Sequence, residues 1–170
     1  MKLYSSKIPS IASDLLRKLK EAGDIEVSDM NEAQLDVEAV LKEYLRLDRD
    51  LTEKSKDLME KRKLPYEQFQ KIKRAMMEER DFGSGEDMPR YLANQILEAF
   101  MHSASVEEVF TEDVELRQKL QVILRKHLTV DDGIDEEVRR RIKNLQEGTA
   151  TWEIEYQRVM DQVKRQQKLS

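Results

Sequence analysis

The chain has 170 residues, of which 39% are apolar and 38% are charged, and its formal net charge is −5 at pH 7. It contains no cysteine, which excludes disulfides, thiolate zinc sites, iron–sulfur clusters and a thiol nucleophile. No uncharged apolar run approaches the roughly 18–20 residues of a membrane span, and the N-terminus lacks the apolar region of a signal peptide. We therefore expect a cytoplasmic protein without a membrane segment.

The first half of the chain has the pattern of amphipathic helices. After Pro9, a stripe with helical spacing runs through Ile11, Ala12, Leu15, Leu16 and Leu19. The stretch "GDIEV" follows, and its alternation of apolar and acidic residues predicts a short strand. Further apolar stripes predict helices around residues 37–45, 51–58 and 69–76.

The second half repeats this order. After Pro89, the stripe Leu92, Ala93, Ile96, Leu97 and Phe100 has the spacing of the first one, and "VEEVF" again predicts a strand. Helical stripes then recur around 120–128, 134–142 and 156–163. The offset between corresponding positions changes only between helices, as expected when loops accept insertions and packed helices do not.

These patterns predict a mostly α protein of about eight helices. We interpret residues 1–83 and 84–170 as two copies of a four-helix unit, related by a pseudo-twofold axis. The two short strands, residues 25–27 and 106–109, would pair as one ribbon across that axis, covered by helices because a lone ribbon is marginal in water. We expect Phe69, Trp152 and Tyr156 to be buried.

Several longer strings resemble a known family. "MKLYSSKIPSIA", "VLKEYLRLDRDLTEKSKDLME", "HSASVEEVF", "LRKHL" and "VRRRIKNLQEGTATWEIEYQRVM" are similar to a bacterial family catalogued as domain of unknown function number five hundred and seven. The resemblance implies a small, mostly helical bacterial protein. It implies no activity, cofactor or site residue.

Few residues suggest catalysis or metal binding. His127 could act as a general base near Asp131 or Asp132, but it lies on an apolar stripe, and we favour a half-buried structural histidine. In "LTVDDGIDEE" we expect Asp131 or Asp132 to cap a helix whose first turn is acidic. The glycines of "DFGSGED" precede a helix without a following lysine, and we interpret them as a linker. We expect no enzyme activity, cofactor or metal.

Basic residues gather late in each half. Residues 59–80 carry a net charge of +3 and residues 138–170 one of +4, whereas residues 11–58 and 81–137 carry −5 and −9. The basic helices could cover acidic parts of the chain, or they could form a surface for an acidic partner. The candidate basic surface consists of Lys61, Arg62, Lys63, Lys71, Lys73, Arg74, Arg139, Arg140, Arg141 and Lys143.

The sequence thus favours a non-catalytic interaction or adaptor protein whose partner is another protein. The alternative is DNA or RNA binding through the basic last helix of each half. The chain could be a monomer or a homodimer.

Overall fold

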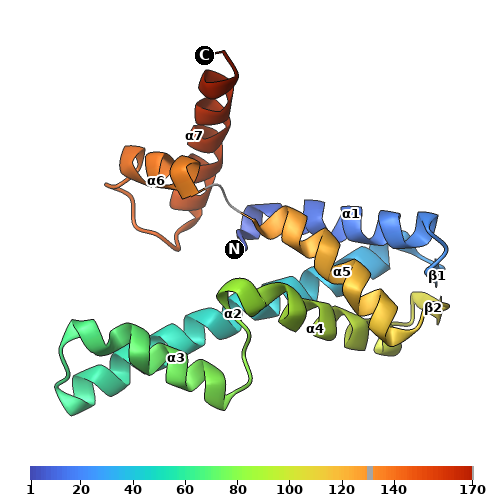
Figure 1. The fold of residues 1–170 in the computed structure, drawn as a ribbon, viewed down its shortest axis with the longest axis horizontal. Helices are drawn as coiled ribbons and strands as arrows, with labels where there is room; N and C mark the ends of the chain where they lie inside the picture. Colours follow the sequence, from blue (N-terminus) through green and yellow to red (C-terminus); the bar gives the residue numbers. More distant parts are fainter. Residues whose placement is uncertain (130–131, 170) are drawn as a thin grey trace.

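The computed structural model describes residues 1–129 and 132–169, apart from the side chains of 132, 168 and 169. Its central body contains α1 (Ile8–Glu21), the first part of α2 (Met30–Arg62), α4 (Met88–His102) and α5 (Asp113–Leu128) (Figure 1). α1 packs on α2 and α4 packs on α5, and both α2·α4 and α1·α5 contacts join the pairs. The predicted apolar stripes lie inward in one shared core that includes Leu15, Leu41, Ile96, Leu120 and Leu124.

A two-stranded antiparallel ribbon joins the two halves at one end of this body. β1 (Ile25–Val27) pairs with β2 (Val106–Val109), with Ile25 opposite Val109 and Val27 opposite Val106. The register shifts between Glu26 and Val27, because β2 has one residue more than β1. The predicted ribbon, with its residues 25–27 and 106–109, is confirmed.

The buried Asp24 adds a polar link beside the ribbon. Its carboxylate accepts hydrogen bonds from the Thr111 hydroxyl at 2.5 Å and from the Lys119 ammonium at 2.7 Å. Burial alone would raise the pKa of Asp24, but these two donors lower it below its ordinary value. The carboxylate therefore stays charged and ties the loop after α1 to α5.

The continuity of α2 corrects the predicted helix count. The separate helices expected around 37–45 and 51–58 form one helix of 33 residues, so the described residues contain seven α-helices rather than about eight. No glycine or proline lies in this stretch. Leu51 and Ser55 face inward, and Lys54 pairs with Asp50 one turn away, so nothing interrupts the helical hydrogen bonds. α2 ends only at Arg62, where the C-cap residue Lys63 has a left-handed φ of 52°.

Beyond the central body, α2 forms a helical hairpin with α3 (Phe69–Glu79), which packs back along it (Figure 1). The turn between them contains Pro65 and the 3-10 turn Tyr66–Gln68. After α3, Phe82 stacks on Tyr44 with 4.6 Å between ring centroids. The Tyr44 hydroxyl donates to the Gly83 carbonyl at 3.0 Å. These contacts fix the linker that leads into α4.

The C-terminal helices form a second hairpin with a core of its own. α6 (Asp132–Arg141) packs on α7 (Ala150–Leu169), and Figure 1 shows this pair standing apart from the α2–α3 hairpin. Its buried residues are Ile134, Val138, Ile142, Trp152, Tyr156, Val159, Met160 and Val163, together with Tyr4 from the N-terminal segment. The predicted burial of Phe69, Trp152 and Tyr156 is confirmed, with exposed fractions of 8%, 4% and 1%.

The two halves share an order of elements but not a helix count. Helix, strand and helix follow one another in each, yet α1, α2 and α3 make up the first half and α4 to α7 the second. The long α2 stands where the second half has α5 and α6. The predicted pair of four-helix units is therefore not observed in that form, and the duplication stays a prediction.

Candidate functional site: the Asp135 cluster and the basic hairpin tip

His127 contacts an aspartate on another helix. Its Nε2 lies 2.7 Å from Asp14 Oδ2 on α1, and Lys18 and Arg17 also pair with Asp14. Burial would raise the pKa of Asp14, but the contacts with His127 and the two cations hold it well below its usual range. The contact joins α5 to α1, in line with a structural histidine. The sequence predicted Asp131 or Asp132 as the neighbour of His127 and as the cap of the next helix. Asp131 and the side chain of Asp132 lie outside the described residues, so the structure does not describe these two roles.

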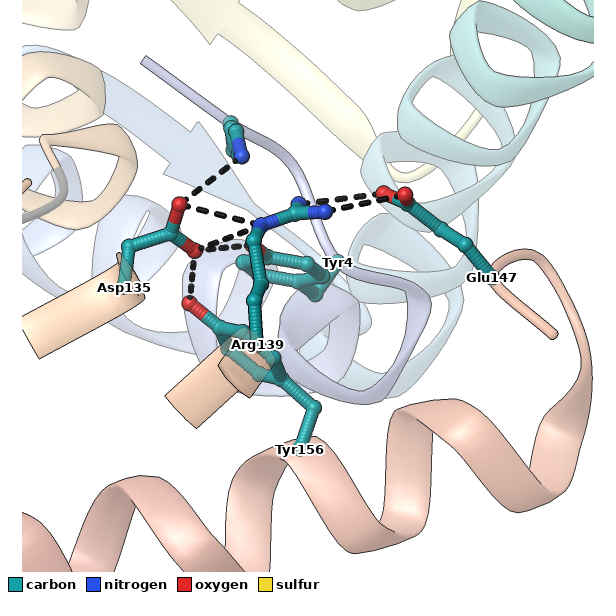
Figure 2. Close-up of polar contacts among 6 residues, drawn as sticks. Tyr4, Asp135, Arg139, Glu147 and Tyr156 are labelled. Atoms are coloured by element: carbon teal, nitrogen blue, oxygen red, sulfur yellow. Dashed lines mark hydrogen bonds and ion pairs between the residues drawn. The ribbon is translucent and has the colours of Figure 1, made fainter. Parts of the chain in front are cut away.

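A second polar group lies where the N-terminal segment meets the α6–α7 hairpin (Figure 2). We call it the Asp135 cluster, and it consists of Lys2, Tyr4, Asp135, Arg139, Glu147 and Tyr156.

Asp135 accepts hydrogen bonds from four side chains. The Tyr156 hydroxyl donates at 2.5 Å and the Tyr4 hydroxyl at 3.3 Å, both to Oδ1, while Lys2 Nζ lies 3.1 Å and Arg139 Nε 3.0 Å from Oδ2. Burial would raise the pKa of Asp135, but the Tyr156 hydrogen bond and the charges of Lys2 and Arg139 outweigh it and lower the pKa. Asp135 is therefore an ionised carboxylate held by two neutral hydroxyls and two cations.

Arg139 connects the cluster to the loop after α6. Its guanidinium makes a bidentate pair with Glu147 at 2.9 and 3.0 Å and lies 5.3 Å from the centre of the Trp152 ring. The pairing with Glu147 raises the pKa of Arg139 above its ordinary value. A guanidinium that is paired twice and stacked on an aromatic ring is held in one orientation.

The aromatic rings of the cluster stack on one another. Ring centroids lie 4.6 Å apart for Tyr4 and Tyr156, and 4.9 Å apart for Trp152 and Tyr156. Burial raises the pKa values of Tyr4 and Tyr156, so both hydroxyls stay protonated and donate to Asp135 at neutral pH. Every hydroxyl that could carry chemistry here is committed to a hydrogen bond, which favours a structural tie.

The cluster holds the N-terminal segment between the central body and the C-terminal hairpin. The Lys2 backbone N–H donates to the Leu128 carbonyl at 2.9 Å, and the Ser5 hydroxyl donates to Glu153 on α7. Sequence reasoning placed Asp135 only in an acidic first turn and missed its partners. The sequence feature that could have indicated the cluster is the i, i+4 pair Asp135–Arg139, because it lies beside the buried residues Ile134, Val138 and Ile142.

The predicted basic residues lie on two separate hairpins. Lys61, Arg62, Lys63 and Lys71 are exposed around the end of the α2–α3 hairpin and make no ion pair with the described residues. Arg74 is exposed farther along α3 and lines a groove beside the N-terminal segment. Lys73 pairs with Asp48 at 3.2 Å. On the other hairpin, Arg139 faces inward, Arg140 and Arg141 pair with Glu137, and Lys143 is exposed. Figure 1 shows the end of the α2–α3 hairpin lying apart from α6, so the structure brings Lys61, Arg62, Lys63 and Lys71 together but not all ten residues.

Exposed apolar side chains lie among those four cations at the hairpin end. Leu64 and Tyr66 are 36% and 77% exposed, and the Tyr66 ring lies parallel to that of the buried Phe69, with 5.9 Å between centroids. We call this surface the α2–α3 tip, and it consists of Lys61, Arg62, Lys63, Leu64, Tyr66 and Lys71.

A groove of about 710 Å³ lies between the N-terminal segment, α2, α3 and the loop before α7. Side chains of both charges line this groove. The cations are Lys2, Arg49, Lys73 and Arg74, and the carboxylates are Asp48, Glu147 and Glu153. In residues 1–129 and 132–169, no group of three or more His, Cys, Asp or Glu side chains is placed to hold a metal ion. None of the helices in the described part of the chain has the length and apolar character needed to cross a bilayer.

Comparison with known proteins agrees with the resemblance of the sequence strings. No curated protein matches the chain. One family model, described as protein of unknown function (DUF507), matches residues 1–169. Because the match covers almost the whole chain, this protein belongs to the DUF507 family.

Proposed function

We propose that this protein is a non-catalytic interaction protein, an adaptor of the bacterial cytosol that binds another protein. The α2–α3 tip is the observation that supports this function most directly. It projects from the central body and combines four cations that make no ion pair among the described residues with exposed leucine and tyrosine side chains.

The chemistry of the tip suits protein recognition. Aromatic side chains and arginine are enriched in protein interfaces, and tyrosine supplies a large contact area at low entropic cost. Tyr66 is 77% exposed, so its burial would be gained only in a complex. The cations would favour a partner with an acidic surface.

Quantitative capture from native bacterial lysate tests this function. Wild-type protein should enrich a specific set of proteins, and Tyr66→Ser combined with Lys61→Glu should lose that set. Ile154→Ser is the matched control, since Ile154 is 65% exposed on α7, away from the tip. Equal capture by wild type and tip variant would refute the role of the tip, and capture of nothing specific would refute the adaptor function.

A second candidate function, nucleic-acid binding, is favoured by the open face of Tyr66. One face of its ring lies over Phe69, and a base could stack on the other while the tip cations contact phosphates. If all four tip cations neutralise phosphates of a single strand, log K should fall against log salt with a slope of roughly −2.8. The absence of binding to a labelled single-stranded oligonucleotide at low salt would remove this candidate.

We also infer that residues 1–83 and 84–170 derive from one duplicated helical unit. The shared order of helix, strand and helix and the antiparallel pairing of β1 with β2 support a twofold relation. Residues 8–45 should superimpose on residues 88–128 including their crossing geometry. A fit no better than that of unrelated helix pairs would end this interpretation.

A further inference from the structure

We propose that the α2–α3 tip of one copy of this chain docks on an acidic surface at the opposite end of a second copy, so that copies associate head to tail. This inference goes beyond the proposed function, because it requires no other protein. The acidic surface, which we call the acidic end, consists of Glu26, Glu107, Glu108, Glu112 and Asp113 with Phe110 and Val114.

The acidic end has the opposite charge of the tip and the same mixture of charged and apolar groups. Its five carboxylate residues are exposed and make no ion pair with the part of the chain that the structure describes. Phe110 and Val114 are each 63% exposed beside them. Met101, 54% exposed, lines the same groove as Asp113 and extends the apolar surface onto α4.

The ribbon adds an independent reason to expect a cationic partner here. Glu26 and Glu108 stand directly opposite each other in the antiparallel pairing. Like charges at directly opposed positions destabilise a strand pair. The register shift beside them leaves Glu107 as a third exposed carboxylate in the same short ribbon. A cation brought by another molecule would relieve this repulsion.

The two surfaces cannot meet within one molecule. α2 begins at Met30, directly after the ribbon, and ends at Arg62 in the tip. Its 33 residues separate the two ends by about 50 Å at 1.5 Å per residue. Figure 1 shows the ribbon and the end of the α2–α3 hairpin on opposite sides of the molecule. The two surfaces therefore cannot neutralise each other within one copy.

A contact between two different surfaces of identical chains is heterologous. A head-to-tail dimer still presents one free tip on one copy and one free acidic end on the other, so growth continues into chains unless the geometry closes a ring. The contact depends on exposed charges and a few apolar side chains, so it should be weak and sensitive to salt.

Sedimentation velocity over a concentration series tests the proposal. In about 0.1 M salt, where the Debye length is ~10 Å, the weight-average mass should rise to at least twice that of the monomer at the highest concentrations. In about 1 M salt, where the Debye length is ~3 Å, it should stay at the monomer value. Wild-type protein that remains monomeric throughout the low-salt series would overturn the proposal.

Charge-reversed variants identify the surfaces. Lys61→Glu/Lys71→Glu at the tip and Glu107→Lys/Glu108→Lys at the acidic end should each be monomeric alone in low salt. An equimolar mixture should associate again, because one variant keeps an intact acidic end and the other an intact tip. The control Lys126→Glu/Lys143→Glu has the same change in net charge as the tip variant, but at exposed positions elsewhere. It should associate like wild type. Circular dichroism verifies that each variant is folded.

The outcomes separate this proposal from the proposed function. Association that is unaffected by either pair of substitutions, or a mixture that stays monomeric, would overturn head-to-tail docking. A monomeric protein whose tip captures a specific protein from lysate would contradict only this inference. A monomeric protein whose tip binds a single-stranded oligonucleotide would contradict it as well and would favour the second candidate function.

Discussion

Tyr156→Phe should selectively weaken the C-terminal hairpin. The substitution keeps the ring that stacks on Tyr4 and Trp152 and removes only the hydroxyl that donates to Asp135 at 2.5 Å. Hydrogen bonds to charged groups contribute about 1.5–3 kcal/mol. Because Asp135 is buried and this is its shortest hydrogen bond, we expect the loss to fall in the upper part of that range. Tyr4→Phe should cost less, because its hydrogen bond is 3.3 Å long.

The single tryptophan makes this prediction measurable. Trp152 lies in the hairpin core, so its fluorescence reports on this core, whereas circular dichroism reports on all helices. For a unit this small, with an m-value near ~1 kcal/mol per molar urea, the urea midpoint of the fluorescence transition should fall by about 2–3 M.

Tyr66→Phe is the matched control, because Tyr66 is 77% exposed and makes no hydrogen bond with the described residues through its hydroxyl. It should change stability by no more than about 0.5 kcal/mol. If Tyr156→Phe shifts the fluorescence midpoint no more than this control, the Asp135 cluster does not hold the hairpin and the reasoning fails.

Three further predictions concern the same core, its pH dependence and the linker before α4. Trp152→Ala should lower the free energy of unfolding by about 3–5 kcal/mol, measured by circular dichroism, while Ile154→Ala on the exposed side of α7 should have little effect. The pKa of Asp135 is lower in the folded protein, so its stabilisation is fully present above the ordinary aspartate value of about 3.9 and is lost as the pH falls through the folded value. Tryptophan fluorescence should therefore show acid-induced loosening in wild type that is weaker in Asp135→Asn; identical profiles would contradict this. Gly83→Ala should destabilise the protein by about 1–3 kcal/mol in thermal melts, because a Cβ there would lie 2.6 Å from Tyr91 Cβ and 3.0 Å from the Asp87 carbonyl oxygen, and an unchanged melting temperature would show that the linker can move.

Much of the fold was predictable from the sequence, because the burial of a helix face is a local property. The stripes at Ile11–Leu19 and Leu92–Phe100 lie in the core, and the alternation in "GDIEV" and "VEEVF" marks the two strands that pair. The continuity of α2 was missed because polar residues between Leu45 and Leu51 resemble a loop in pattern. In fact they form a solvated helix face with ion pairs such as Lys54–Asp50.

The Asp135 cluster was not predictable from periodicity. Its partners Lys2 and Tyr4 lie 133 and 131 residues away in the chain, and a spacing rule says which side of a helix is buried but not which distant segment covers it. For the same reason Arg139 was grouped with surface arginines. It lies one turn from Asp135 and next to Trp152, and only the packed hairpin shows that its charge is satisfied internally.

A single uninterrupted helix runs from the strand ribbon through the main core and out to the end of the α2–α3 hairpin. An uninterrupted helix bends little, so a displacement of Arg62 at one end would also move the residues near Met30 at the other. Binding of a partner at the protruding end could therefore shift α2 relative to α1 and α4, on which it packs. Replacing the exposed Arg49 by proline would interrupt the helix between the two ends without shifting the residues on either side out of register.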